Sequence, residues 1–212
     1  MAYRYLCLQN AIVDWQRKDV LYHKLICTND LQIEKEDKMV LETKRLVLRE
    51  LTIDDLRNWH VILSDPETMA HYPQPFSLEK TKQWIDWNLE NYRTYGYGLW
   101  AVILKESALF IGDCGITMQQ INGKLEPEIG YHINKAYTGK GYASEAAQAC
   151  RDYAFEGLKL STVYSYMKYT NTASRRVAEK NGMKLIAELP DKTNGMTTVY
   201  AITLHEYLTV KA

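Results

Sequence analysis

The 212-residue sequence predicts one α/β domain in which helices flank a mixed, mostly antiparallel central sheet. Three observations carry this prediction. The first half of the chain contains short apolar segments separated by turn residues, a pattern typical of β-hairpins. The second half alternates expected strands with expected helices, which is typical of a sheet covered by helices. Between the halves, "INGK" at 121–124 contains an Asn-Gly pair, which favours a two-residue hairpin turn.

The expected elements follow one another from Met39 onward. The acids in "TIDDL" favour a helix start near Asp54, and Ser77 suits the N-cap of a second helix, which "YGYG" ends near Tyr95. The expected strands are 45–51, 98–105, 108–118, 127–134, 161–168, 183–189 and 197–206. The expected helices are one from about residue 54, followed by 77–95, 141–157 and 171–181.

Residues 1–38 differ in pattern from the rest of the chain. They end in the charge-rich stretch "EKEDK" and lack clear strand and turn signals. Met39 is followed at once by "VLETKRLVLREL", which alternates as a strand does. Two interpretations stay open: 1–38 is an extension of a domain formed by 39–212, or it contains an N-terminal helix packed on the core.

Composition excludes several classes of partner. Basic and acidic residues both number 26, so net charge gives no reason to expect nucleic acid or an acidic membrane surface. No apolar run reaches the roughly 18 residues of a membrane span, and Gln9 and Asn10 interrupt the one near the N-terminus. The four cysteines lack paired spacing, which indicates reduced thiols rather than a metal site. We expect a cytoplasmic monomer or homodimer without a bound metal.

The stretch "YTGKGYASEA" at 137–146 is the clearest binding signal. Gly139 and Gly141 flank Lys140 and lead from an expected strand into an expected helix. Glycines let the backbone approach a ligand closely, and free N–H groups at a helix start favour phosphate. The alternative is an ordinary strand-to-helix turn that binds nothing.

Two other phosphate motifs fail on spacing. A P-loop needs glycine where Asn134 stands and serine or threonine at Gly141. A dinucleotide fingerprint needs glycine at Ser144, and it usually follows the first strand of a βαβ unit. The turn therefore belongs to another kind of phosphate site.

The segment "AYTGKG" resembles the acetyl-CoA pyrophosphate loop of the GNAT acetyltransferases, Q/R-x-x-G-x-G/A, with Ala136 in place of the polar first residue. Three further segments resemble the RimJ/RimL-like branch of that family, which acetylates the N-termini of ribosomal proteins: "ETKRLVLRELTIDDL", "EPEIGYHI" and "NTASRRVAEKNGM". With "GYASEAA" they occur in the family's order and cover about residues 40–207. The resemblance implies the GNAT fold.

The same resemblance implies which residues hold acetyl-CoA, the expected co-substrate. In the family, one strand pairs its backbone with the pantetheine amides, the glycine turn holds the pyrophosphate, and an asparagine contacts the pantetheine arm or an ordered water. The corresponding residues are Tyr131, His132 and Ile133 for the strand, Gly139, Lys140, Gly141, Tyr142, Ala143 and Ser144 for the turn, and Asn171.

Glu128 is the expected base that deprotonates the acceptor amine. Alternation places Glu128, Gly130 and His132 on one face of their strand. A carboxylate is costly to bury without a purpose, and related enzymes use an acid in this strand as a base. Glu128 as a solvated strand-end residue is the alternative. His132 is either a second candidate base or a hydrogen-bonded packing residue.

Ser174 is the expected proton donor to the leaving thiolate. It lies three residues after Asn171, on the same helix face. Many GNAT enzymes use a tyrosine seven residues after the asparagine, but Ala178 stands there, and the resemblance to the RimJ/RimL-like branch assigns the role to the serine. The alternatives are a helix-surface serine and an asparagine that serves only as an N-cap.

These predictions converge on an enzyme that transfers an acetyl group from acetyl-CoA to a primary amine by direct attack on the thioester. The acceptor is a protein N-terminus or a small-molecule amine. The alternative is a non-catalytic CoA-binding regulatory or interaction module on the same fold. Aromatic residues in segment 70–77 together with Trp84, Trp87 and Trp100 either line the acceptor cleft or belong to the core.

Overall fold

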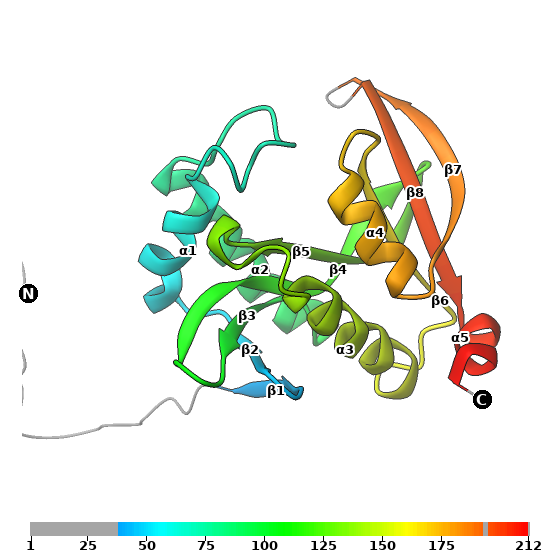
Figure 1. Cartoon of the computed structure of the whole chain (residues 1–212), viewed down its shortest axis with the longest axis horizontal. Helices are drawn as coiled ribbons and strands as arrows, with labels where there is room; N and C mark the ends of the chain where they lie inside the picture. The colour runs from blue at the N-terminus through cyan, green and yellow to red at the C-terminus, as the bar shows by residue number, and fades with distance from the viewer. Residues whose placement is uncertain (1–37, 193–194, 212) are drawn as a thin grey trace, which may run out of the picture. The chain divides into compact units, whose positions relative to one another are not determined.

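The computed structural model describes residues 38–192 and 195–211. Apart from Lys38, the predictions for residues 1–38 lie outside the described residues. Eight described strands form one sheet in the order β1-β2-β3-β4-β5-β6-β8-β7 (Figure 1). Neighbouring strands are antiparallel except for β5 and β6, which are parallel. The predicted mixed, mostly antiparallel sheet is therefore confirmed.

The expected strands and helices are present, together with one further strand, β1, and one further helix, α5. The strands are β1 (Met39–Glu42), β2 (Leu46–Glu50), β3 (Leu99–Leu104), β4 (Leu109–Ile121), β5 (Lys124–Ile133), β6 (Thr162–Lys168), β7 (Lys184–Asp191) and β8 (Gly195–Thr203). The helices are α1 (Leu56–Leu63), α2 (Leu78–Tyr95), α3 (Tyr142–Glu156), α4 (Thr172–Lys180) and α5 (Leu204–Lys211), with short 3-10 turns η1 (Ile53–Asp55) and η2 (Lys135–Tyr137).

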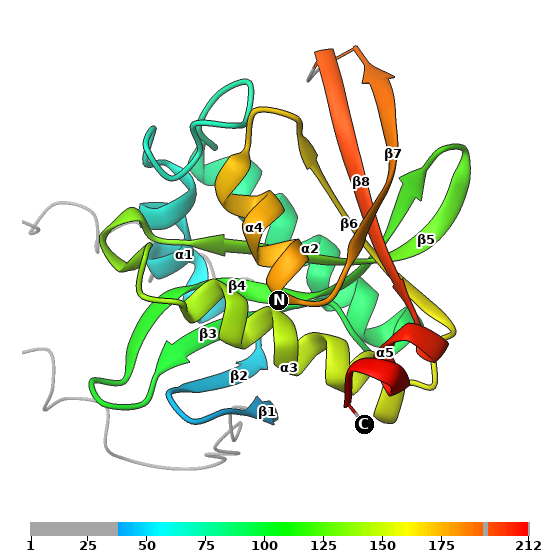
Figure 2. The ribbon, with the colours of Figure 1, turned by 45° about the vertical axis from the view of Figure 1, so that its right-hand side comes forward.

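Helices cover both faces of the sheet and enclose a separate core on each. Figure 2 shows α3 and α4 in front of the sheet and α2 behind it. The core on the α3 side includes Ile129 and Ile133 of β5, and the core on the α1 and α2 side includes Trp59, Ile85 and Leu99. Successive side chains of β5 point to opposite faces of the sheet, so this strand contributes residues to both sides.

Local sequence signals explain several element boundaries. The Ser77 hydroxyl accepts a hydrogen bond from the Lys80 backbone N–H at 3.2 Å, and α2 ends at Tyr95, where the C-cap Gly96 has a φ of 79°. At the β4–β5 turn, Asn122 and Gly123 have φ values of 50° and 75°. Two successive positive φ values suit the right-handed twist of a hairpin, so the Asn-Gly prediction is confirmed.

The structure corrects two of the expected elements. The segment expected as one strand at 45–51 is preceded by β1, and the two strands form a hairpin. The strand expected at 197–206 ends at Thr203, and a helix begins there. Thr203 and Glu206 hydrogen-bond each other's backbone N–H, which forms a capping box. The spacing "TLHE" was the sequence signal for this helix.

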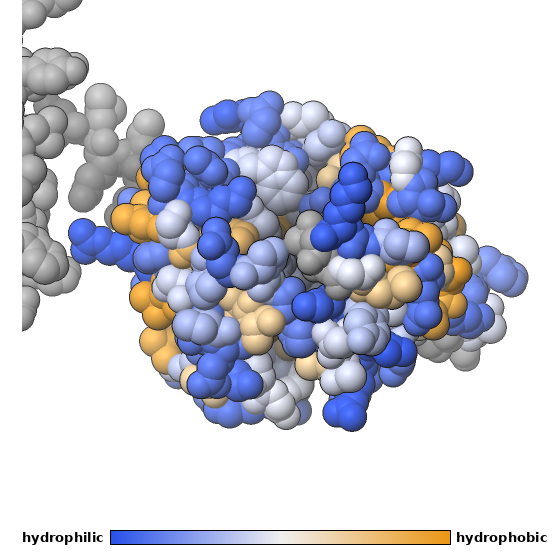
Figure 3. Space-filling model, turned by 90° about the horizontal axis from the view of Figure 1, so that it is seen from above, coloured by the Kyte–Doolittle hydropathy of each residue, from blue (hydrophilic) through white to orange (hydrophobic). Residues whose placement is uncertain are grey.

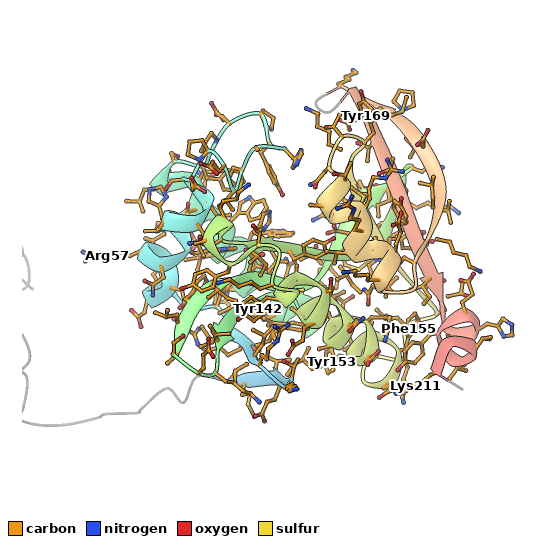
Figure 4. The ribbon with its side chains drawn as sticks, in the orientation of Figure 1. Arg57, Tyr142, Tyr153, Phe155, Tyr169 and Lys211 are labelled. Atoms are coloured by element: carbon orange, nitrogen blue, oxygen red, sulfur yellow. The ribbon has the colours of Figure 1, made fainter. Side chains whose placement is uncertain are left out.

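Small side chains bring α3 close to the sheet. Ala146, Ala147, Cys150 and Ala154 are fully buried. The Sγ atoms of Cys114 and Cys150 lie 3.5 Å apart as free thiols. Cys7 and Cys27 lie outside the described residues. At the end of α3, the Phe155 ring stacks on Tyr207 of α5 with centroids 4.8 Å apart, a region that Figure 4 marks with Phe155 and Lys211.

One face of the described part of the chain is largely polar. Figure 3 shows the face seen from above, where hydrophilic side chains predominate and hydrophobic ones form separate groups. Among the described helices, none is both long and apolar enough to cross a membrane.

We predict that a chain beginning at Met39 folds. β1 begins at that residue, and the described contacts that the truncation removes are the exposed ion pair of Lys38 with Glu50 and one backbone hydrogen bond between the same residues. An exposed ion pair contributes at most about 1 kcal/mol. Circular dichroism and urea unfolding of the truncated and full-length proteins test this. An insoluble or unfolded truncated chain would show that residues 1–38 belong to the core.

Candidate active site

The two parallel strands at the centre of the sheet separate after a single residue pair. Within the described residues, β5 pairs with β6 only at Glu128 and Tyr164. One residue further on, the Ser165 hydroxyl donates to the Ile129 carbonyl at 3.1 Å, so a side chain replaces the backbone bond. From Gly130 to Ile133, β5 pairs with β4 on its other side alone. An inner backbone edge is therefore free to pair with a ligand.

A cavity of about 310 Å³ lies at this separation. Its lining includes residues of the loop between α1 and α2 and of the start of α4, two segments that Figure 1 shows near the top of the molecule. It has lining residues from both faces of the sheet. They include Tyr72, Trp84, Glu128, Tyr131, His132 and Ser174.

Glu128 lies inside this cavity and is only 9% exposed. Glu128 is therefore not a solvated residue. It is also not at the end of its strand, because β5 begins four residues earlier. The Thr117 hydroxyl donates to Glu128 Oε2 at 3.3 Å. A Cβ atom at Gly130 would lie 3.1 Å from the same oxygen, so the glycine leaves room for the carboxylate. Burial raises the pKa of Glu128 to about 7, although His132 and Thr117 partly oppose this shift.

His132 connects a buried carboxylate to a tyrosine. Its Nδ1 lies 2.9 Å from Asp113 Oδ1, and its Nε2 lies 2.6 Å from the Tyr72 hydroxyl. Asp113 also accepts a 2.7 Å hydrogen bond from the indole N–H of Trp59. Burial alone would lower the pKa of His132, but Asp113 and Glu128 oppose it more strongly and the pKa is raised overall. His132 is thus both hydrogen-bonded and part of the cavity wall.

Ser174 and Tyr131 meet on the opposite side of the cavity. The Tyr131 hydroxyl lies 2.8 Å from Ser174 Oγ and donates to the Ser174 carbonyl at 3.0 Å. Asn171 caps α4, because its Oδ1 accepts a 3.0 Å hydrogen bond from the Ser174 backbone N–H. Burial raises the pKa of Tyr131 well above its ordinary value, so its phenol stays protonated. This wall therefore offers two adjacent hydroxyl groups as hydrogen-bond or proton donors.

The glycine turn follows β5 directly and ends at α3. Gly139 and Gly141 have φ values of 77° and 83°, in the left-handed region that favours glycine. Gly141 is the N-cap of α3 and has no side chain to cap the first N–H groups. A Cβ atom at Gly139 would meet nothing within 4 Å, which leaves open space over the turn. Free donors beside open space fit a phosphate group.

Arg45 fixes the turn to the edge of the sheet. Its guanidinium pairs with Glu145 of α3 at 2.6 Å and donates to the Lys140 carbonyl at 2.9 Å. The same guanidinium lies 4.4 Å from the centre of the Tyr142 ring, which Figure 4 labels at the start of α3. These contacts hold the helix start in one place before any ligand arrives.

The sequence profile that matches this chain decides its family. Residues 45–184, more than half of the chain, match the profile of the acetyltransferase (GNAT) domain. The chain belongs to the GNAT acetyltransferase family. This finding confirms the family resemblance of the sequence, and the protein is an acetyltransferase.

Two relatives from Bacillus subtilis (strain 168) are similar to this GNAT chain over most of their length. The uncharacterized protein YkkB is 37% identical over 147 residues, which are 69% of this chain and 86% of the relative. The uncharacterized N-acetyltransferase YnaD is 33% identical over 148 residues, 69% of this chain and 83% of the relative.

Solved structures show the same fold. The acetyltransferase from Agrobacterium tumefaciens str. C58 superposes with a TM-score of 0.67 at 32% identity, covering 76% of this chain and 92% of that one. RimL, a ribosomal L7/L12 alpha-N-protein acetyltransferase solved in complex with coenzyme A, superposes with a TM-score of 0.64 at 19% identity, covering 78% and 98%. The GNAT fold prediction is confirmed.

The structure brings together some of the predicted GNAT site residues and leaves others apart. Five line the cavity: Glu128, Tyr131, His132, Asn171 and Ser174. The turn residues Gly139, Lys140, Gly141, Tyr142, Ala143 and Ser144 do not line it, and Ile133 packs into the core on the α3 side. Of the three tryptophans, Trp84 and Trp87 line the cavity, whereas Trp100 is buried in the core.

Sequence reasoning missed Asp113, and it missed the side-chain contacts of two residues that it had offered as candidates, Tyr131 and, within segment 70–77, Tyr72. Asp113 is a fully buried acid in the apolar strand β4, and its position within "LFIGDCGITM" was a usable signal because lone buried charges need partners. Tyr72 comes from a loop with no periodic pattern, so only the fold reveals its contact with His132. The side chain of Tyr131 reaches Ser174 from the expected apolar face of its strand.

The raised pKa of Glu128 predicts a specific pH dependence of stability. The folded protein holds the Glu128 proton up to about pH 7, whereas the ordinary pKa is 4.5. Stability from this group is therefore present at low pH and is lost as pH rises through about 7. Relative to the wild type, Glu128→Gln should gain about 3 kcal/mol of unfolding free energy between pH 4.5 and pH 8.5.

Urea unfolding at several pH values measures this difference. Glu126→Gln is the matched control, because Glu126 lies two residues earlier on the same strand and outside the cavity lining. The same pH dependence in both variants would contradict the buried, protonated state of Glu128.

Proposed function

We propose that this protein transfers the acetyl group of acetyl-CoA to a primary amine by direct attack of the neutral amine on the thioester. One observation carries the proposal: the cavity joins a buried carboxylate on one face of the sheet to a pair of hydroxyl groups on the other. An amine and a thioester that meet in the gap between β5 and β6 have a proton acceptor on one side and proton donors on the other.

The chain offers suitable groups to hold acetyl-CoA. The free edge of β5 at Tyr131, His132 and Ile133 suits backbone pairing with the pantetheine amides. The open turn from Gly139 to Ser144 suits the pyrophosphate. Both sites lie along one continuous segment of chain, and the solved complex of RimL with coenzyme A has the same fold. When bound, acetyl-CoA supplies the activated acetyl group.

Glu128 is the proposed base. An ammonium ion has no lone pair, so the acceptor must lose a proton before it attacks. A carboxylate with a pKa of about 7 is half ionised near neutral pH and releases the proton readily afterwards. Burial in the cavity thus converts an ordinary glutamate into a base matched to neutral pH.

Ser174 is the proposed acid, with Tyr131 as its hydrogen-bond partner. A thiolate leaves more readily when it receives a proton, and Ser174 Oγ is held at the gap by the α4 cap and by Tyr131. The phenol of Tyr131 keeps its proton because of burial, and its hydroxyl stays within hydrogen-bond distance of Ser174 Oγ. This pair occupies the role that a tyrosine at the position of Ala178 has in many GNAT enzymes.

The acceptor is proposed to be either a small amine or a protein N-terminus. Trp84 and Trp87 line the cavity on the Glu128 side, so the acceptor approaches between aromatic rings and a carboxylate. Aromatic faces and a nearby anion both favour a cationic amine before it is deprotonated. A turnover screen settles the choice with 2-phenylethylamine, spermidine, glucosamine and peptides that begin with alanine, serine or methionine.

We predict that Gly139→Ala weakens acetyl-CoA binding at least about tenfold, because its methyl group lies where the phosphate approaches and the backbone resists the required φ. Gly123→Ala is the matched control. Gly123 has a φ of 75°, also with open space around its Cβ position, but lies in the β4–β5 hairpin. Both variants should lose about 1 kcal/mol of stability, and isothermal calorimetry should show weaker binding for Gly139→Ala alone. Equal affinities would place the cofactor elsewhere.

We predict that Glu128→Gln and Ser174→Ala each lower kcat by about 10²–10⁴-fold with little change in the KM for acetyl-CoA. Steady-state kinetics with the best acceptor of the screen measures this. Ser174→Ala should lose less activity with an acyl donor whose thiol is more acidic. Glu126→Gln, on β5 outside the cavity lining, is the control for Glu128→Gln. Ser161→Ala, at an exposed serine, is the control for Ser174→Ala. Tight acetyl-CoA binding without turnover of any amine would instead support the non-catalytic module.

A further inference from the structure

Tyr72, His132 and Asp113 form a continuous chain of hydrogen bonds that ends in the cavity. The Tyr72 hydroxyl lies 2.6 Å from His132 Nε2, and His132 Nδ1 lies 2.9 Å from Asp113 Oδ1. The Asp113 side chain is fully buried and that of His132 is 9% exposed. A hydroxyl, an imidazole and a buried carboxylate in this order make an arrangement that can move a proton.

The partners of Asp113 fix the direction of the chain. An indole N–H is a donor only, so Asp113 Oδ2 accepts from Trp59. Asp113 Oδ1 then accepts from His132 Nδ1–H, which leaves Nε2 of the neutral imidazole as an acceptor. The Tyr72 hydroxyl therefore donates to Nε2 and keeps its lone pairs for a group in the cavity.

Ring packing holds Tyr72 in this position. Although 39% of Tyr72 is exposed, its ring packs against His132 at 5.4 Å and edge-on against Phe76 at 5.8 Å. Tyr72, His132 and Glu128 line the same cavity. The hydroxyl therefore faces the side of the cavity where the amine is deprotonated.

The stoichiometry of amide formation calls for a second proton acceptor. An ammonium nitrogen carries three hydrogens, and the amide nitrogen that it becomes carries one. Glu128 takes one of the two protons, and the departing sulfur takes a proton from Ser174. The other proton leaves the nitrogen as the new C–N bond forms, when Glu128 is already protonated.

We propose that Tyr72 is a further catalytic residue, which accepts this second proton while it passes its own proton to Nε2 of His132. The inference rests on the proposed function. One N–H bond of the substrate breaks as an O–H bond forms on Tyr72, and the Tyr72 O–H bond breaks as an N–H bond forms on His132. Asp113 is a positioning residue that stabilises the resulting imidazolium. His132 and Glu128 then each release a proton to solvent, and Ser174 regains one from solvent, so net one proton is released per acetyl transfer.

Several charged groups set the pH range of this relay. Asp113 of β4, Glu128 of β5 and Tyr72 of the loop between α1 and α2 face His132 directly. His71 and Lys168 line the same cavity and add positive charge when protonated. Only the neutral imidazole accepts a proton, so kcat should rise with pH as His132 and Glu128 lose theirs. When two groups must lose a proton, the acidic side of the plot of kcat against pH is steeper than when one group must do so.

The test compares Tyr72→Phe, His132→Gln and the double variant, with the best acceptor of the screen. Each single variant should lower kcat about a hundredfold, with the KM for the amine within about twofold. The double variant should be no slower than the slower single variant, because both changes interrupt one path. The acidic limb of kcat against pH should become less steep in all three. Tyr95→Phe is the matched control, because Tyr95 is 41% exposed and outside the cavity lining.

Each other outcome overturns the relay. Wild-type kcat in Tyr72→Phe, a loss confined to KM, or additive losses in the double variant would each show that Tyr72 only binds the acceptor or packs the loop. Calorimetry separates this from failure of the proposed function, because all variants should bind acetyl-CoA as the wild type does. Absence of turnover by the wild type with every amine tested would contradict the proposed function and the relay together.

Discussion

The separation of β5 from β6 after the Glu128–Tyr164 pair is the constraint on which the rest of the site depends. Interior strands normally satisfy both backbone edges, so an inner edge that is left free requires another partner. The separation also removes the barrier between the two faces of the sheet. Glu128 from one face and Ser174 from the other therefore line one cavity, which a fully paired sheet would divide.

The site is prepared at a cost in stability. Glu128 is buried, and its pKa is raised to about 7 because burial disfavours its charge more than the hydrogen bonds from Thr117 and the Tyr166 backbone favour it. On the same face, Asp113 is held by Trp59 and His132, so the two buried acids have different surroundings. Two carboxylates in different surroundings can take different roles in proton transfer. Rigid core packing around Trp59 keeps these geometries fixed.

Local sequence signals were enough for most of the fold and for part of the site. The Asn-Gly turn and the Ser77 cap were predicted correctly because each depends on a few neighbouring residues. The family motifs located Glu128 and Ser174 in one cavity. The contact of Tyr72 with His132 spans 60 residues and leaves no local pattern. The strand prediction ran to residue 206, into the first turn of α5, because the alternation was followed past the capping box at Thr203. The role of residues 1–38 stays a prediction.

A crystal structure of the protein with bound coenzyme A tests the central claim most directly. The account predicts that the pantetheine arm pairs with the backbone of β5 between Tyr131 and Ile133, with the sulfur at the gap near Ser174 and the pyrophosphate over Gly139 to Ser144. A second hollow lies between β1 and α3, lined by residues that include Glu42, Asp152 and Tyr153. Coenzyme A bound in that hollow, with the gap between β5 and β6 closed or empty, would contradict the account.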